Sequence, residues 1–450
     1  MDAGAQLPDK LLSRIYNAKE ELERSSNIRI ISHYDADGIS SAGILCSALL
    51  REGKQFHTTL VKGLTDQIVQ EAAEECELLI FSDMGSSNLD AIEESGCKAI
   101  ILDHHGPPRD SEKVIHVNPH LVGIDGMTSA SASAICMLFA INLDERNWDL
   151  LHNAFAGIVG DRQAIRGLSG VNKWLFDNGL ERNFVKKIPG SLYPLGDLQN
   201  GLYSSTDPYI YGVSGNHDGV EKLLSEADIE DDISSQDLSE SQGRKLSSLI
   251  ALKLVEQGVP MSTMEEVIHE RYFFPHVNMD AGDLASLLNA CGRSNNESIG
   301  LALTLGDPDA LEKARDLRAE YVDEVLAGLD HIAREGVSKM SDIQYFINKS
   351  IGLSGILSGV TMQYIGDRDK PTIAMSEHDE GIKISSRATF QLLDQGVDLA
   401  IAMRESAAKV GGFGGGHRIA AGATVPKGRE EEFLSILNDI IKDQKESIDA

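Results

Sequence analysis

The stretch ILDHHGP, residues 101–107, ends an apolar run abruptly at Asp103, His104 and His105, and a Gly-Pro turn follows. A short apolar run bounded by turn residues is typical of a buried strand. Carboxylates and imidazoles are ligands for divalent cations. These seven residues alone leave two interpretations open: a metal site at the end of a strand, or a capped turn with two surface histidines.

The same arrangement recurs through the first third of the chain. Four apolar runs alternate with helix-like stretches: IRIIS (28–32), ELLIFS (77–82), KAIIL (98–102) and VIHVN (114–118). This alternation predicts an α/β domain with a parallel sheet. The polar residues that follow the first two runs are His33, Asp35, Asp37 and Asp83. Because loops beyond the carboxyl ends of parallel strands converge on one crevice, we expect these side chains to meet Asp103 and both histidines there.

The segment SHYDADG presents His33, Asp35 and Asp37 on alternate residues. An extended segment would place all three on one side of the chain. Mixed carboxylate and imidazole ligands suit Mn²⁺, Mg²⁺ or a related divalent ion, and the absence of cysteine ligands argues against structural zinc. The segment also lacks the twelfth-position glutamate of an EF-hand loop.

The composition is that of an ordinary globular protein, with 450 residues, 42% hydrophobic and 25% charged. No apolar run is long enough for a membrane span. The N-terminal stretch reads as an amphipathic helix that is too charged for a signal peptide, so a cytoplasmic location without membrane attachment is expected. The five cysteines contain no C-x-x-C pair, which argues against a disulfide framework or a zinc knuckle.

The net charge of −29 opposes long-range attraction to nucleic acid. The acid excess is uneven, however, because residues 382–418 hold five Lys or Arg against three acids. A local basic surface, helped by bound cations, remains compatible with a phosphate backbone.

Three regions are expected: residues 1–175 as an α/β catalytic domain, 176–335 as a helical insertion and interdomain linker, and 336–450 as a smaller α/β substrate-binding domain. The middle region is mostly helical and acidic, and residues 311–336 read as one long amphipathic helix. Strand patterns resume at 343–347, 371–375 and 381–385.

The segment GGFGGGHRIAAGA, residues 411–423, has five glycines in its first six positions. Glycines at this density let backbone N–H groups approach an anion closely. His417 and Arg418 add side-chain donors, and KISSRAT supplies Ser386 and Arg387 at the end of a predicted strand. The alternative interpretation is a flexible hairpin.

Four motifs, HYDADG, SDMG, LDHHGP and IVGD, occur in this order within residues 28–161. Together they resemble the motifs of the DHH phosphoesterase family, and GGFGGGH resembles the glycine loop of the DHH-associated domain. The resemblance implies two Mn²⁺ ions per active site, with Mg²⁺ or Co²⁺ as substitutes. It also implies a water between the ions as the nucleophile.

The resemblance assigns roles residue by residue. The first ion would take His33, Asp35 and a shared Asp83; the second would take Asp37, Asp83, His104 and Asp161. Asp103 would orient a histidine, and His105 would contact the scissile phosphate or the leaving oxygen. The terminal nucleotide would be held by Gly414, Gly415, Gly416 and His417, with Ser386 and Arg387.

Further stretches, STDPYIYGVSG, LLNACGRSN and GLALTLGD, resemble archaeal RecJ-like single-strand exonucleases. The implied function is a two-metal-dependent phosphodiesterase that acts as an exonuclease on single-stranded DNA or RNA in replication or repair. Protein partners such as GINS or a repair helicase are implied as well.

Other functions are weighed against this one. A short-oligonucleotide or cyclic-dinucleotide phosphodiesterase is a close alternative. A replisome scaffold subunit that pairs with helicase components is another, but clustered carboxylates are costly without cations, and every motif aspartate and histidine is present. The GNHD stretch at 215–218 matches part of a metallophosphatase motif, yet a second carboxylate is missing after Asp161.

Overall fold

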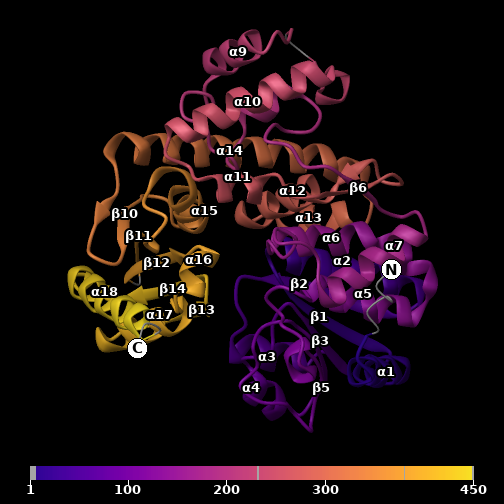
Figure 1. The fold of residues 1–450 in the computed structure, drawn as a ribbon. Coiled ribbons are helices and arrows are strands. Elements are labelled where there is room, and N and C mark those ends of the chain that lie inside the picture. The colour runs from indigo at the N-terminus through magenta and orange to yellow at the C-terminus, as the bar shows by residue number, and fades with distance from the viewer. Residues whose placement is uncertain (1–6, 231–232, 380, 448–450) are drawn as a thin grey trace. The chain divides into compact units, whose positions relative to one another are not determined.

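The computed structural model describes residues 7–230, 233–379 and 381–447 (Figure 1). The chain divides into two compact units: unit 1 comprises Met1–Gly190 and Ile268–Ala319, and unit 2 comprises Ser191–Val267 and Glu320–Ala450. The middle region, expected as a separate insertion, is thus shared between the units. The reason is that its helices share cores with one unit or the other.

Unit 1 is built on a five-stranded parallel sheet in the order β2-β1-β3-β4-β5. The strands are β1 (Asn27–His33), β2 (Gln55–Val61), β3 (Leu78–Ser82), β4 (Lys98–Leu102) and β5 (Ile115–Val117). The chain order reverses between β1 and β3, which in open α/β sheets is where ligands bind. The predicted α/β class and parallel sheet are confirmed.

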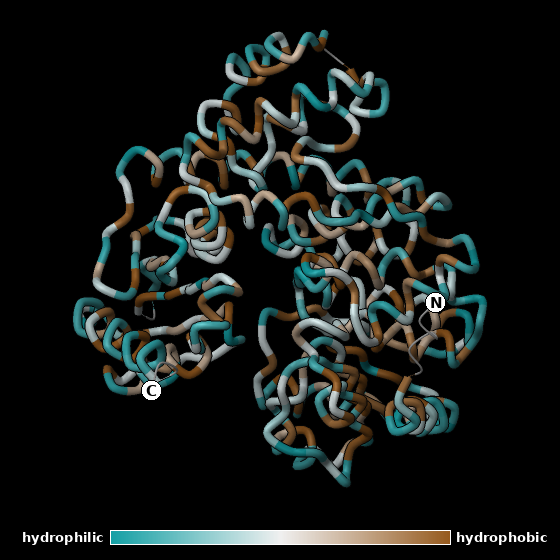
Figure 2. The backbone as a smooth tube through the Cα atoms, in the orientation of Figure 1, coloured by the Kyte–Doolittle hydropathy of each residue, from teal (hydrophilic) through white to brown (hydrophobic). Residues whose placement is uncertain are grey.

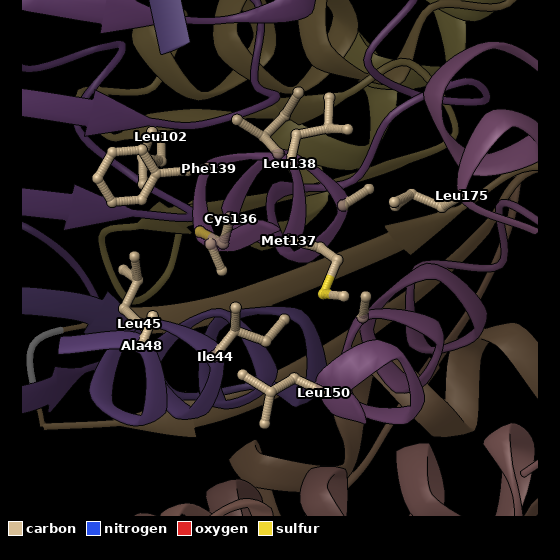
Figure 3. Packing of buried hydrophobic residues seen from close by; sticks show 14 of the residues in the cluster. Ile44, Leu45, Ala48, Leu102, Cys136, Met137, Leu138, Phe139, Leu150 and Leu175 are labelled. Atoms are coloured by element: carbon tan, nitrogen blue, oxygen red, sulfur yellow. The ribbon is translucent and has the colours of Figure 1, made fainter. Parts of the chain in front are cut away.

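Helices cover both faces of this sheet. They are α1 (Asp9–Arg24), α2 (Ala36–Arg51), α3 (Asp66–Ala73), α4 (Leu89–Glu94), α5 (Ala132–Leu143), α6 (Leu151–Gly160) and α7 (Gly170–Glu181). Alternate strand residues point to opposite faces, so Ile30 and Ile80 join the core with α1, α2 and α5, while Ile31 and Phe81 pack against α3 and α4. Figure 3 shows part of the first core, to which Leu45 of α2, Leu102 of β4 and Phe139 of α5 contribute buried side chains.

The second segment of unit 1 adds α12 (Ala281–Arg293) and α13 (Glu297–Thr304), with the small sheet β6 (Lys186–Ile188), β7 (Arg271–Phe274) and β8 (Met279–Asp280). The buried face of α12, with Leu284 and Leu288, shares a core with Ala36 and Ile39 of α2 and Ala156 of α6. This contact brings α12 beside the first turn of α2.

Unit 2 contains a mixed six-stranded sheet in the order β13-β14-β12-β11-β10-β9. Its strands are β9 (Ser338–Lys339), β10 (Gln344–Ile347), β11 (Thr372–His378), β12 (Gly381–Arg387), β13 (Phe413–His417) and β14 (Ala420–Val425). One face packs on α17 (Leu399–Lys409) and α18 (Glu430–Glu446). The glycine-rich segment, expected to bring backbone N–H groups close to an anion, forms an edge strand that pairs with β14 as a hairpin.

The remaining helices of unit 2 are α8 (Leu198–Tyr203), α9 (His217–Glu226), α10 (Glu240–Glu256), α11 (Met261–Val267), α15 (Ser354–Val360) and α16 (Phe390–Asp394). The long helix predicted at 311–336 is α14 (Pro308–Glu335). In the GNHD stretch, Asn216 accepts the N–H of Gly219 as the N-cap of α9, and His217 stacks on Tyr203. This stretch therefore has a capping role.

Surface helices alternate between hydrophilic and hydrophobic colours along their turns in Figure 2, as expected of elements with one buried side. In α18, for example, Phe433, Leu437 and Ile441 are buried at helical spacing. Among residues 7–230, 233–379 and 381–447, no helix has both the length and the apolarity needed to cross a membrane.

Candidate metal centre

The acidic and imidazole side chains of the four motifs lie together at the carboxyl edge of the unit 1 sheet. His33 ends β1, Asp83 follows β3, and Asp103 with both histidines follows β4. Asp161 arrives from a helix, because it is the C-cap of α6. Three overlapping groups have ligand atoms within 4.8 Å of one another: His33, Asp35 and Asp83; Asp37, His104 and Asp161; and Asp83, Asp103, His104 and His105.

The first group is centred on His33. Its Nδ1 lies 3.0 Å from Asp35 Oδ2 and 3.4 Å from Asp83 Oδ2. The second group is centred on His104, whose Nε2 lies 3.3 Å from Asp161 Oδ2 and 3.9 Å from Asp37 Oδ2. The other oxygen of Asp83, Oδ1, is 3.3 Å from His104 Nε2. Asp83 thus faces both groups: its Oδ2 lies near His33, and its Oδ1 lies near His104.

The expectation that His33, Asp35 and Asp37 share one side of an extended segment is wrong. The strand ends at His33, Asp35 is the N-cap of α2, and Asp37 lies in the first helical turn. The helix begins here because the carboxylate of Asp35 accepts the N–H of Gly38, which satisfies a free donor of the first turn. Because the chain changes from strand to helix here, Asp37 is separated from His33 and Asp35 and lies in the group centred on His104.

Asp83 has a left-handed backbone conformation, with φ of 56°. This conformation is uncommon outside glycine, although Asp and Asn tolerate it better than other residues. Backbone strain of this kind is concentrated at functional sites. Here it turns the chain directly after β3, so that the buried carboxylate of Asp83 lies between the two groups.

Asp37 is held by the N-terminus of α5. Its Oδ2 accepts the N–H of Ala132 at 2.8 Å, and its Oδ1 accepts the N–H of Ser133 at 3.0 Å. A helix N-terminus stabilises an anion through its free N–H groups and its dipole. The position also depends on Gly157 of α6, where a Cβ would lie 2.1 Å from Asp37 Oδ1 and 2.1 Å from Ser133 Oγ.

We expect Gly157→Ala to weaken metal binding and to destabilise the fold by about 1–3 kcal/mol, the usual cost of overpacking. The added methyl group must displace the carboxylate of Asp37 or the start of α5. Calorimetric Mn²⁺ titration and thermal melting measure the two effects. Gly63→Ala is the matched control, because a Cβ at Gly63 would meet nothing within 4 Å. Unchanged metal affinity in Gly157→Ala would contradict a ligand role for Asp37.

The imidazole of His104 is oriented by contacts on its far side. Its Nδ1 donates to the carbonyl oxygen of Gly126 at 2.8 Å, which leaves Nε2 facing the carboxylates. The side chain of Gln163 donates to the same carbonyl at 2.9 Å and in turn accepts from Asn172 at 2.7 Å. Such partners fix the tautomer and orientation of a metal-binding histidine. Sequence reasoning missed Gln163 and Asn172, because no motif or periodicity marks them.

Asp103 and His105 form a pair, with Asp103 Oδ1 2.7 Å from His105 Nδ1. Asp103 is buried, whereas the His105 side chain is 39% exposed, so a buried carboxylate holds a partly exposed ring. Asp103 also accepts the N–H groups of His104 and Ser86.

A second layer of buried polar groups lies behind this pair. The side chain of Asn118 donates to the carbonyl oxygen of His105 and to the hydroxyl of Ser86, and that hydroxyl lies 2.9 Å from His116 Nε2. His116 is thus a fully buried residue of β5 that supports the segment of Asp103, His104 and His105.

The electrostatics of the site follow from crowded, buried carboxylates. Burial and the charge of Asp83 raise the pKa of Asp37 to about 6. Burial and the charge of Asp37 likewise raise the pKa of Asp161 well above its usual value. Burial opposes protonation of His33, yet Asp35 and Asp83 outweigh it and raise the pKa of His33 well above its usual value. The site therefore favours additional positive charge.

These properties fit a pair of divalent cations. The donors are carboxylate oxygens and imidazole nitrogens, the set that suits Mn²⁺ and related ions. Cations would neutralise the carboxylates and take the place of the protons that the site otherwise retains. Asp83 offers one oxygen to each group, which is the arrangement that a bridging ligand requires.

The predicted substrate-binding residues lie in unit 2. Arg387, at the end of β12, packs its guanidinium against α15, where a Cβ at Gly355 would lie 2.9 Å from its Nη2. His417 ends β13, and cross-strand pairing through Ala420 places it in one row with Arg387. Ser386 is not brought to this row: it is fully buried on the opposite face, and its hydroxyl donates to the carbonyl oxygen of Ala421.

Comparison with known proteins shows two family domains. Residues 27–159 match the N-terminal domain of the DHH family, and residues 342–443 match the DHHA1 domain. An uncharacterized protein of Methanocaldococcus jannaschii is 32% identical over 447 residues, which are 97% of this chain and 98% of that protein. The single-stranded-DNA-specific exonuclease RecJ of Thermus thermophilus is 27% identical over 174 residues, 36% of this chain and 26% of that protein.

Solved structures show the same fold. RecJ of Thermus thermophilus in complex with Mn²⁺ has a TM-score of 0.62 at 18% identity, covering 98% of this chain and 56% of that one. CDC45 from Entamoeba histolytica has a TM-score of 0.64 at 12% identity, covering 96% of this chain and 99% of that one. Since the sequence match extends over almost the whole of both chains in the methanogen relative, and both domains match their family models, this protein belongs to the DHH family and carries a DHHA1 domain.

Proposed function

We propose that this protein is a metal-dependent phosphodiesterase that removes nucleotides from one end of single-stranded DNA or RNA. The observation that carries the proposal is the pair of ligand groups joined by Asp83. The family membership and the likeness to a single-stranded-DNA-specific exonuclease support the choice of substrate.

In this proposal His33 and Asp35 would hold one cation, Asp37, His104 and Asp161 would hold the other, and Asp83 would serve both. Two such cations, when bound, lower the pKa of a water nucleophile and stabilise the attacking and leaving oxygens of an in-line displacement. Mn²⁺ is the expected ion, with Mg²⁺ or Co²⁺ as substitutes, because imidazole ligands favour the softer ion.

The chain's own groups have distinct tasks. The N-terminus of α5 holds Asp37, and Gly126 fixes the ring of His104, so both ligands are positioned before substrate arrives. Asp103 holds the ring of His105 through Nδ1, and in this proposal His105 contacts a phosphate oxygen or the leaving oxygen. Arg387 and His417 supply binding groups for a substrate phosphate.

End-labelled DNA and RNA oligonucleotides incubated with Mn²⁺ test the proposal directly. A ladder that shortens from one end supports an exonuclease and gives its polarity and its preference between DNA and RNA. Cleavage restricted to oligonucleotides of a few residues, or to cyclic dinucleotides, would favour the short-substrate alternative. No hydrolysis of any of them would leave a scaffold role, with partners such as GINS or a repair helicase.

We expect Arg387→Ala and His417→Ala to raise KM on oligonucleotides, and to lower kcat if binding energy helps align the scissile bond. A hydrogen bond to a charged group contributes about 1.5–3 kcal/mol, so kcat/KM should fall by roughly one to two decades. The loss should be small on a minimal chromogenic phosphodiester. Arg404→Ala, an exposed arginine of α17, is the control. Equal losses on both substrates would show that these residues support the fold rather than the substrate.

A further inference from the structure

The face of the unit 2 sheet that carries His417 and Arg387 continues beyond them. In the pairing of β13 with β14 and β14 with β12, Phe413 lies opposite Thr424, and Thr424 lies opposite Lys383. Cross-strand partners share one face of a sheet. Because residues 413 and 417 differ by an even number, Phe413 and Lys383 are on the same face as His417 and Arg387.

Between these two rows the sheet has almost no side chains. Gly415 pairs with Gly422, and a Cβ at Gly415 would meet nothing within 4 Å. The opposite face has no such free space, since a Cβ at Gly414 would lie 2.7 Å from the carbonyl oxygen of Met403 in α17. The face with Phe413 is therefore smooth and open at β13, while the other face is packed.

Phe413 stands at the edge of this open area. It is 70% exposed, and it is the most exposed aromatic side chain in the part of the chain that the structure describes. A single exposed apolar residue needs no explanation by itself. An exposed aromatic ring at the start of a glycine strand, with open space beside it, is different, because it offers a flat surface that a planar group can cover.

Lys383 supplies charge in the same row. It makes no ion pair with any of the described residues, although the chain as a whole has a net charge of −29. The row of Lys383 and the neighbouring row of Gly415 contain no acidic residue. Their members are Phe413, Thr424, Lys383, Gly415, Gly422 and Ser385. Lys383 lies two strands from Phe413, roughly 10 Å across the sheet, and its flexible four-carbon stem can shorten that span.

We propose that this face is a nucleotide subsite: one unpaired base of a single strand stacks on Phe413, and a neighbouring phosphate binds Lys383. This inference rests on the proposed function and specifies how the substrate is selected. Stacking on an aromatic ring accepts every base, so binding should be independent of sequence. It requires a base that is free of its complementary strand, so a fully paired end should be excluded.

The stacking is tested with the full-length chain and oligonucleotides that carry 2-aminopurine near one end. Phe413→Ala should raise KM for hydrolysis in Mn²⁺ by about 5- to 150-fold, as expected for the loss of one stacked base. It should also abolish the change in 2-aminopurine fluorescence on binding. Phe413→Trp should restore both. Tyr16→Ala, which removes a 59% exposed aromatic from α1, should change neither.

The phosphate contact is tested by salt dependence, which a purely structural role would not alter. Lys383→Ala should reduce the slope of log affinity against log salt by about 0.7, the value for one phosphate contact on a single strand. Lys383→Arg should keep the slope. Lys427→Ala is the control, because Lys427 is already paired with Glu377 on the same domain.

The outcomes separate the two proposals. If the wild-type protein hydrolyses oligonucleotides but Phe413→Ala and Lys383→Ala match it in KM and salt slope, this subsite is overturned and the proposed function stands. If the wild-type protein neither hydrolyses nor binds any oligonucleotide, the proposed function and the subsite both fail.

Discussion

Asp83→Asn should lower kcat/KM by about three decades or more while the protein remains folded. Altering a residue that merely supports a metal ligand typically costs about 10- to 100-fold, and Asp83 faces both ligand groups directly. Asparagine is the informative substitution, because it tolerates the φ of 56° at this position and keeps the size of the side chain while removing its charge.

Folding of this variant is checked by thermal melting without metal. The melting temperature should stay the same or rise, because the change relieves repulsion among buried carboxylates. Asp90→Asn is the matched control: Asp90 is highly exposed in α4 and pairs with Arg109, so its loss should leave activity intact. Substantial hydrolysis by Asp83→Asn would rule out Asp83 as the bridging ligand.

Removal of divalent cations should leave the protein inert, and Mn²⁺ should restore hydrolysis at least as well as Mg²⁺. The same titration has a readout that does not depend on activity. A ligand that binds only the folded state at 100 times its Kd stabilises that state by about 2.7 kcal/mol, so Mn²⁺ should raise the melting temperature of the stripped protein.

The variants Asp83→Asn and Asp90→Asn show whether the effect of Mn²⁺ on the melting temperature comes from this site. The Mn²⁺-dependent rise in melting temperature should be lost or strongly reduced in Asp83→Asn and retained in Asp90→Asn. Hydrolysis that persists in excess chelator, with no effect of Mn²⁺ on melting, would contradict the assignment of two cations to this site.

The sequence by itself was sufficient for the α/β class, the parallel sheet of unit 1 and the family. These features depend on local patterns: buried strands such as β3 and β4 are continuous apolar runs, and the motif residues directly follow them. Strand β2 (QFHTTLV) was missed, because an edge strand with only partial burial has no apolar run to reveal it.

Only the tertiary structure decided how residues far apart in the chain meet. Asp37 joins His104 and Asp161 because a helix begins between Asp35 and Asp37. Gly157 leaves room for that carboxylate, a constraint that exists only because α6 passes beside it. The glycine strand shows the same limit. Its composition indicates that another group can approach the backbone closely. Whether Ser386 or Ser385 faces the open side depends on the register of β12 against β14, because a shift of one residue exchanges the two faces. Local sequence patterns define elements, whereas packing determines which of their residues converge.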